Sequence, residues 1–242
     1  MLTTQAQLRH TQSELDTFLA HHLVTGAGMH VLGLGALAQN LNNIQVVCMH
    51  SDHATEPTWQ ALYDVAAAQE GLFTTKQAAA AGYSPPLLAH HQKTGRIARI
   101  RRGIYRLVHF PSGEQEELVT AWLWTDSQGV LSHQTALALH GLSDVLPAQI
   151  HLTLPLSWRR RRFRVPRGFV LHHADISPSE RAWAGAVPVT SVRRTLNDCA
   201  VAGLSPDLLR QGAKQALARG LVTRAEMGAV QKALKAFGGL KG

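Results

Sequence analysis

The chain has 242 residues, a length that suits one large domain or two of ordinary size. Hydrophobic residues make up 45% of it and charged residues 17%, which excludes a disordered, collagen-like or disulfide-dense chain. Lys and Arg number 24 against 16 Asp and Glu, so the net charge of +8 makes an anionic partner, above all nucleic acid, a leading candidate.

The two cysteines, Cys48 and Cys199, form neither a disulfide framework nor a metal motif, which favours a reducing cytoplasm. The most apolar stretch, residues 23–38, is shorter than the roughly 20 residues of a membrane span. It resembles a signal peptide only weakly, because acidic residues outnumber the single Arg9 before it. We therefore expect a cytoplasmic protein without a membrane segment.

Residues 1–55 differ from the remainder of the chain, since Arg9 is their only Lys or Arg. Residues 26–43 are rich in Gly, Ala and Asn without a clear period. We expect residues 1–55 to form a poorly ordered extension. Met49 lies just before recognisable structure begins, which suggests a mis-assigned start, with translation beginning at Met49; N-terminal sequencing of the native protein would test this.

Residues 57–110 are predicted to form a winged helix-turn-helix. Apolar side chains at helical spacing follow Trp59, and Gly71 ends that helix. Thr75 is the expected N-cap of a short helix at 76–81, and Ser84 begins a third helix that runs to about Lys93. Basic and apolar residues then alternate over 96–101, and a turn at 102–103 leads into 104–108, the pattern of a β-hairpin wing.

Residues 114–240 are predicted to form a mixed α/β domain, so the expected fold class is α+β. A helix is expected over 114–126, a short helix capped by Ser132, and strands over 150–154 and 169–173. Three further helices are expected, at 191–201, at 205–219 and from 223 to about 237.

The winged helix carries the predicted DNA-binding surface. Between Gly71 and Gly113 there are seven Lys and Arg and no acidic residue. In this fold the third helix enters the major groove while the wing contacts the phosphate backbone. The predicted contacts are Lys76, Pro86, Ala89, His90, Lys93, Arg96, Arg99, Arg101 and Arg102. The alternative is a merely solvated basic face.

A second basic feature lies between the two predicted strands of the second domain. Adjacent like charges repel one another unless they are solvated or bound to an anion. The segment is either a second contact with nucleic acid or a partner, or a solvated loop with aromatic anchors. Its candidate residues are Trp158, Arg159, Arg160, Arg161, Arg162 and Arg164.

The sequence predicts no metal site, no cofactor and no catalytic residues. Among 14 histidines, His133 and His140 are seven residues apart with no third ligand near them in sequence, and we interpret both as packing residues. Phosphate loops and nucleophile elbows are absent from the sequence. Asp175, Glu180 and Asp198 are scattered, so a nuclease-related enzyme is the minority hypothesis.

Several segments together resemble the AbiEi-type antitoxins of type IV toxin–antitoxin systems. The resemblance covers about residues 58–225, and the order of its segments is more specific than any one of them. They are LFT at 72–74, GYS at 82–84, Leu88, Gly95, Ile97, RGIY at 102–105, LSHQTALALHGL at 131–142, IHLTLP at 150–155 and VPVTSVRRTLNDCA at 187–200.

The resemblance implies a prokaryotic antitoxin that represses its own operon by binding inverted repeats in the promoter. It also implies a functional partner, a nucleotidyltransferase-like toxin, with or without direct contact. Some relatives append a nuclease-like domain, whereas only helical sequence follows residue 201 here. The alternatives are a nuclease-related enzyme with a winged helix, an orphan transcriptional regulator and an RNA-binding module.

Overall fold

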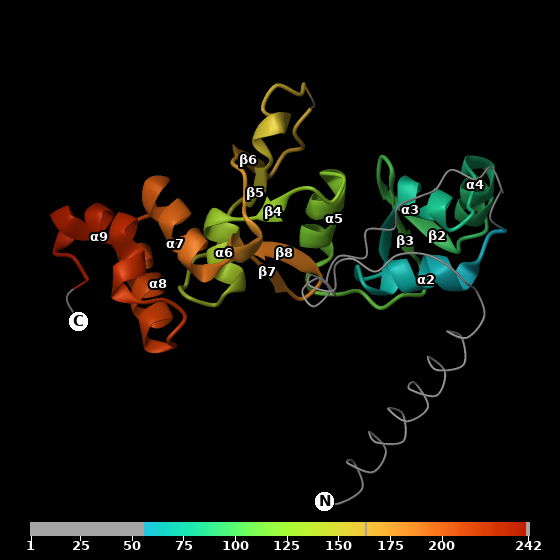
Figure 1. Cartoon of the computed structure of the whole chain (residues 1–242). Helices are drawn as coiled ribbons and strands as arrows, with labels where there is room; N and C mark the ends of the chain where they lie inside the picture. Colours follow the sequence, from blue (N-terminus) through green and yellow to red (C-terminus); the bar gives the residue numbers. More distant parts are fainter. Residues whose placement is uncertain (1–55, 163, 241–242) are drawn as a thin grey trace, which may run out of the picture. The chain divides into compact units, whose positions relative to one another are not determined.

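The computed structural model describes residues 56–162 and 164–240. The predictions for residues 1–55 and for Met49 lie outside this part of the chain. The first elements follow the order of a winged helix (Figure 1). They are α2 (Trp59–Ala67), β1 (Leu72–Thr74), α3 (Thr75–Ala80), α4 (Pro85–Lys93), β2 (Ile97–Arg101) and β3 (Ile104–Leu107).

The three strands of the winged helix form one antiparallel sheet in the order β1-β3-β2. Strand β1 was not predicted, because three residues are too few to show a period. The cap of α3 lies one residue earlier than predicted: the Thr74 hydroxyl accepts from Gln77 N, and the Gln77 side chain accepts from Thr74 N. This reciprocal capping box fixes where β1 ends and α3 begins.

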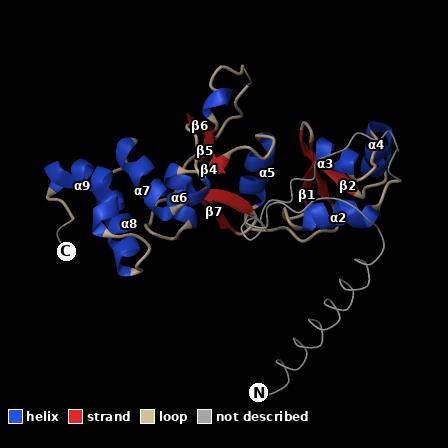
Figure 2. Cartoon of the chain, viewed as in Figure 1, coloured by secondary structure: helices blue, strands red, loops and turns tan. Residues whose placement is uncertain are grey.

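The second part of the described chain is mixed α/β, as predicted (Figure 2). Its strands form a five-stranded sheet in the order β6-β5-β4-β8-β7. The strands are β4 (Val130–Leu131), β5 (Ile150–Leu154), β6 (Phe169–His173), β7 (Arg181–Ala184) and β8 (Val187–Thr190). The α-helices are α5 (Glu116–Trp124), α6 (His133–Leu139), α7 (Val192–Val201), α8 (Pro206–Ala218) and α9 (Gly228–Leu234). Short 3-10 helices are η1 (Leu156–Trp158), η2 (Pro178–Glu180), η3 (Arg224–Met227) and η4 (Lys235–Phe237).

The sheet is mixed, and its pairing determines which distant residues meet. Strand β5 is antiparallel to β4 and parallel to β6, while β8 is parallel to β4 and antiparallel to β7. Strands β4, β7 and β8 were not predicted because they are only two to four residues long. The last predicted helix is divided into η3, α9 and η4.

Buried side chains form three clusters. One lies inside the winged helix around Leu62, Phe73 and Leu88. One is helical, around Leu137, Leu196 and Leu209. The third covers the five-stranded sheet and also contains Leu72 and Ile104 of the winged helix. Apolar packing therefore continues across the predicted boundary at 110–114, and the division into domains at 57–110 and 114–240 stays a prediction.

Candidate nucleic-acid interface

Helix α4 presents the face predicted from the sequence. Ser84 caps it by accepting a hydrogen bond from Leu87 N at 3.4 Å, and Pro85 occupies its first position. Leu88 is 2% exposed and anchors the helix in the core. The four predicted residues, Pro86, Ala89, His90 and Lys93, are all exposed, and so are Pro85 and Gln92.

His91 holds α4 against α2 and is not part of this exposed face. Its ring centroid lies 5.9 Å from that of Trp59 and 5.6 Å from that of Tyr83. Burial and the positive charge of Arg96 lower the pKa of His91. The neutral imidazole therefore acts as an aromatic packing group, which leaves His90 as the histidine of α4 that is oriented to solvent.

The wing deviates from regular alternation. The register of β2 against β3 shifts between Arg99 and Arg101, and such a bulge changes the face to which the following side chains point. Ile100 lies three residues after the buried Ile97, so it is on the other face of the strand, and it is 40% exposed. Arg101 turns the other way, and its guanidinium lies 5.3 Å from the ring centroid of Phe169 in β6. Arg101 thus makes a cation–π contact within the chain.

Among the remaining basic residues of the winged helix, Arg106 is half-buried, with Nε 3.3 Å from Glu116 Oε2, and the others are exposed. Arg96, Arg99 and Arg102 are exposed on the wing. Lys76 Nζ lies 2.9 Å from Asp126 Oδ2, with both side chains well exposed, so this ion pair is weak and exchangeable. The exposed basic surface therefore consists of Lys76 on α3, Lys93 on α4 and three arginines of the wing.

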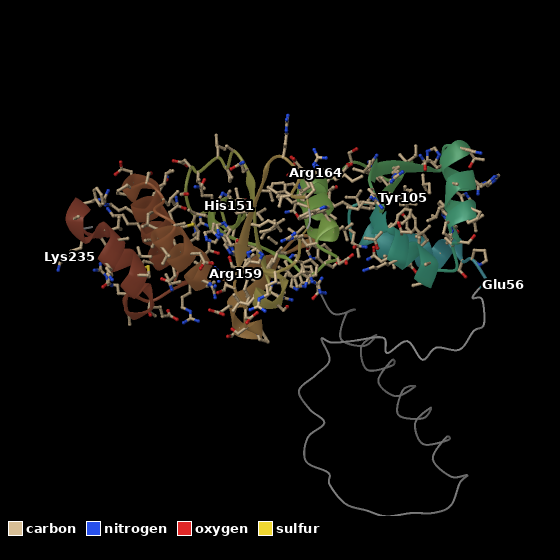
Figure 3. The ribbon with its side chains drawn as sticks, turned by 90° about the horizontal axis from the view of Figure 1, so that it is seen from above. Glu56, Tyr105, His151, Arg159, Arg164 and Lys235 are labelled. Atoms are coloured by element: carbon tan, nitrogen blue, oxygen red, sulfur yellow. The ribbon has the colours of Figure 1, made fainter. Side chains whose placement is uncertain are left out.

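The arginine segment forms the loop between β5 and β6, which Figure 1 shows extending from the sheet, and Figure 3 labels its Arg159 and Arg164. The guanidinium of Arg161 lies 4.1 Å from the ring centroid of Trp158. This stacking covers one face of the aromatic ring. The exposed arginines of the loop are the five predicted candidates, Arg159, Arg160, Arg161, Arg162 and Arg164, and also Arg167.

The two carboxylates that looked scattered in the sequence converge on one arginine. Arg194 donates from Nε to Asp198 Oδ1 at 2.8 Å and from Nη1 to Glu180 Oε1 at 3.1 Å. Burial raises the pKa of Asp198. Asp175 lies apart from them and accepts from Leu156 N at the start of η1. The prediction that all three are dispersed is wrong for Glu180 and Asp198, which both form ion pairs with Arg194.

Three histidines from different elements form a cluster that the sequence analysis missed. His133 begins α6, His151 lies in β5 and His172 lies in β6; one ring nitrogen of each lies within 4.8 Å of the others. The premise that His133 has no third potential ligand nearby is therefore wrong. Sequence spacing could not reveal the cluster, because the parallel pairing of β5 with β6 creates it. His140 does pack as expected, with Nε2 at 2.7 Å from Thr190 O.

The fold and its exposed basic face define the class of the protein. Helices α2, α3 and α4 with the β2–β3 wing form a winged helix, a fold of transcriptional regulators. Residues 60–108, which span almost all of this module, match the family model of the AbiEi antitoxin transcriptional regulators. This match confirms the resemblance drawn from the sequence for this part of the chain.

The comparisons with curated proteins and with solved structures do not extend this assignment. No curated protein matches the chain significantly. A crystal structure of the RV2827C protein from Mycobacterium tuberculosis is similar at 15% identity and a TM-score of 0.44, covering 72% of this chain and 69% of that one. Similarity at this level carries no functional argument. Within the described residues, no helix combines the length and the apolar character needed to cross a membrane.

Proposed function

We propose that this protein is a DNA-binding antitoxin of a type IV toxin–antitoxin system that represses its own operon in the cytoplasm. In this proposal residues 57–110 bind inverted repeats in the promoter, and residues 114–240 form the antitoxin domain. It acts without catalysis and counteracts a nucleotidyltransferase-like toxin.

One observation carries the proposal: the segment that matches AbiEi regulators is a winged helix whose exposed charges from Gly71 onward, on α3, α4 and the wing, are all positive. His90 lies on the solvent side of α4, where it can reach a base edge. Lys93, Arg96, Arg99 and Arg102 are exposed on α4 and the wing, where they can contact phosphates on both sides of the groove. Pro86 and Ala89 are small enough to let α4 approach the bases closely.

The test compares the chain's own upstream region with a scrambled duplex of equal length, in a fluorescence-anisotropy titration of the full chain at low salt. We expect tighter binding to the upstream region, because base contacts add to the phosphate contacts common to both duplexes. His90→Ala should reduce this preference, while His109→Ala, an exposed histidine after β3, should leave it unchanged. Equal affinity for both duplexes would contradict the proposal.

The antitoxin role is tested separately. Co-expression with an adjacent nucleotidyltransferase-like gene should restore the growth that the toxin alone abolishes. A chain that binds its promoter but fails to restore growth is an orphan regulator, which is the alternative for this protein.

The loop between β5 and β6 supports a second contact, with RNA or with the toxin. Its arginines are exposed and carry no acidic neighbours within residues 156–174. Replacing Arg159, Arg160 and Arg162 by Gln should abolish capture of the toxin or of RNA if the loop is that contact. Arg161 is kept in this variant because it stacks on Trp158. If the variant captures the toxin or RNA as well as the parent does, the loop is a solvated surface loop and not this contact.

A further inference from the structure

The three-histidine cluster is built by the tertiary fold at the edge of the five-stranded sheet. Strand β6 is the edge strand, and its register with β5 places His172 opposite Thr153, two residues along from His151. Side chains two residues apart on a strand point to the same face, so His151 and His172 lie side by side. His151 Nδ1 and His172 Nε2 are hydrogen-bonded to each other at 3.1 Å, so one of the two carries the shared proton in the metal-free chain. Figure 3 labels His151 within this part of the chain.

His133 completes the cluster from the first turn of α6. Its ring stacks on that of His172 with centroids 3.5 Å apart and an interplanar angle of 15°. The backbone of His133 has φ +52°, in the left-handed region that side chains other than glycine seldom adopt. The fold thus maintains an unfavourable backbone conformation at the residue that brings the third imidazole to the other two.

A hydroxyl pair orients the ring of His133. Ser132 Oγ lies 2.9 Å from His133 Nδ1 and accepts a hydrogen bond from Thr153 Oγ1 at 2.8 Å. Ser132 occupies the N-cap position of α6, yet its side chain makes no capping hydrogen bond to the helix. Its hydrogen bond with the ring engages Nδ1 in either tautomer of His133, so Nε2 is the ring nitrogen that is available to a metal ion. Metal-binding histidines are commonly oriented in this way by an acceptor on the other ring nitrogen.

The three imidazoles are neutral at pH 7. Burial, followed by repulsion from His172, His151 and Arg194, lowers the pKa of His133 to about 3. Burial also lowers the pKa of His151, and burial with repulsion from His151 and His173 lowers that of His172 to about 4. The charge of Arg194 is balanced by Glu180 and Asp198. Neutral imidazole is the form that coordinates metal ions.

We propose that His133, His151 and His172 bind one divalent transition-metal ion of the zinc type. Ring nitrogens bound to a tetrahedral ion at about 2.0–2.1 Å lie about 3.4 Å from one another. The 3.1 Å separation of His151 and His172 is close to this value. The ligand atom of His133 lies within 4.8 Å of the others, but its ring is stacked on that of His172. Because the lone pair of an imidazole nitrogen lies in the ring plane, the ring of His133 must rotate out of this stack to bind the same ion. An all-imidazole ligand set suits zinc, copper or nickel and not magnesium or calcium.

The position of the site indicates what the ion does. It joins the start of α6 to β5 and to the edge strand β6, so it fixes the two strands from which the arginine loop extends. His151 and His172 are only half-buried, which gives the ion access and leaves its fourth position to water. The site goes beyond the proposed DNA-binding function and does not depend on it.

The experiment uses the full chain, stripped with EDTA, dialysed and titrated with Co²⁺, whose visible absorption reports tetrahedral coordination. We expect His151→Asn and His172→Asn each to lose one equivalent of tetrahedral Co²⁺ that the parent chain binds. His90→Asn, on the exposed face of α4, should keep it. Zn²⁺ should raise the melting temperature of the parent and of His90→Asn but not that of the other two variants, because an ion that binds only the native state stabilises it.

Histidines in residues 1–55 are present in every variant, so ions bound there cancel in the comparison. If the cluster variants bind as much Co²⁺ as the parent, or if the parent binds none, the proposal is overturned. Circular dichroism of the metal-free variants shows whether they fold. If they do not, carbethoxylation of the parent chain decides: Zn²⁺ should protect His151 and His172 in peptide mapping and leave His90 reactive, and unchanged reactivity of all three would refute the site.

Discussion

The salt dependence of DNA binding tests the assignment of phosphate contacts on α4 and the wing. Lys93, Arg99 and Arg102 are exposed and without an ion-pair partner among the described residues, whereas Arg101 lies over Phe169. The perturbation is the triple variant Lys93→Gln, Arg99→Gln and Arg102→Gln, which removes three charges without touching the core. We expect it to weaken binding most at low salt.

The magnitude follows from counterion release. Each phosphate neutralised contributes about 0.9 to the slope of log affinity against log salt, so the triple variant should flatten this slope by about 2.7 units. Between 50 and 200 mM salt, the affinity of the parent for DNA should therefore decrease by a factor about 40 times larger than the factor for the triple variant. Arg101→Gln alone should change the slope by clearly less than 0.9, because its guanidinium is engaged within the chain.

Fluorescence anisotropy over a series of salt concentrations measures these slopes. The matched control replaces Lys214, Lys232 and Lys235 by Gln, three exposed lysines of the C-terminal helical region that change the net charge by the same amount. The control slope should equal that of the parent. Equal flattening in both variants would mean that only net charge matters, and an unchanged slope in the wing variant would refute the assigned surface.

Three further predictions concern stability and reactivity. Gly71→Ala should destabilise the chain more than Gly95→Ala in urea denaturation. Both glycines have a positive φ, which costs alanine about 1–2 kcal/mol. A Cβ at Gly71 would also lie 2.7 Å from Phe110, and this clash adds about 1–3 kcal/mol. Similar losses for the two would contradict this packing argument. Arg194→Met should lower the free energy of unfolding at pH 7 by about 2–4 kcal/mol, which is less than for a fully buried ion pair because both side chains keep some exposure. The exposed control Arg193→Gln should lower it by less than about 0.5 kcal/mol. Burial raises the folded-state pKa of Asp198, so the ionised carboxylate lowers the free energy of unfolding as the pH rises through that pKa. The loss of stability caused by Arg194→Met should therefore shrink as the pH falls from 7 towards 4, where the carboxylate is protonated. A loss that grows over this range would be evidence against this argument. Burial raises the pKa of the Cys199 thiol to about 12, so iodoacetamide at pH 8 should modify Cys199 in urea but not in the native chain, as peptide mapping would show; rapid native alkylation would disprove it.

The winged helix could be predicted from the sequence because its signals are local. The Ser84–Pro85 start of α4, the alternating residues of the wing and the terminating glycines each specify their own segment. The exposure of His90 and Lys93 likewise follows from helical spacing once Leu88 is placed in the core. The seven Lys and Arg between Gly71 and Gly113, with no acidic residue among them, already favoured a polyanionic partner.

Other features depended on contacts between residues distant in the sequence. A bulge in β2 directs Arg101 towards Phe169, about seventy residues later, and away from the exposed wing. Arg194 gathers Glu180 and Asp198, which spacing alone had left apart. Such contacts depend on strand register and helix placement, neither of which has a signature in local composition.

The sequence by itself thus determined the winged helix, its basic character and the family that it resembles, because caps, turns and periodicity act over a few residues. Only the tertiary structure decided which charges are available to a ligand and which histidines meet. His133, His151 and His172 are separated by 18 and 21 residues in the chain and are brought together by the pairing of two parallel strands beside a helix start. Parallel pairing joins segments through a long crossover, so nothing near each histidine in the sequence could have revealed its partners.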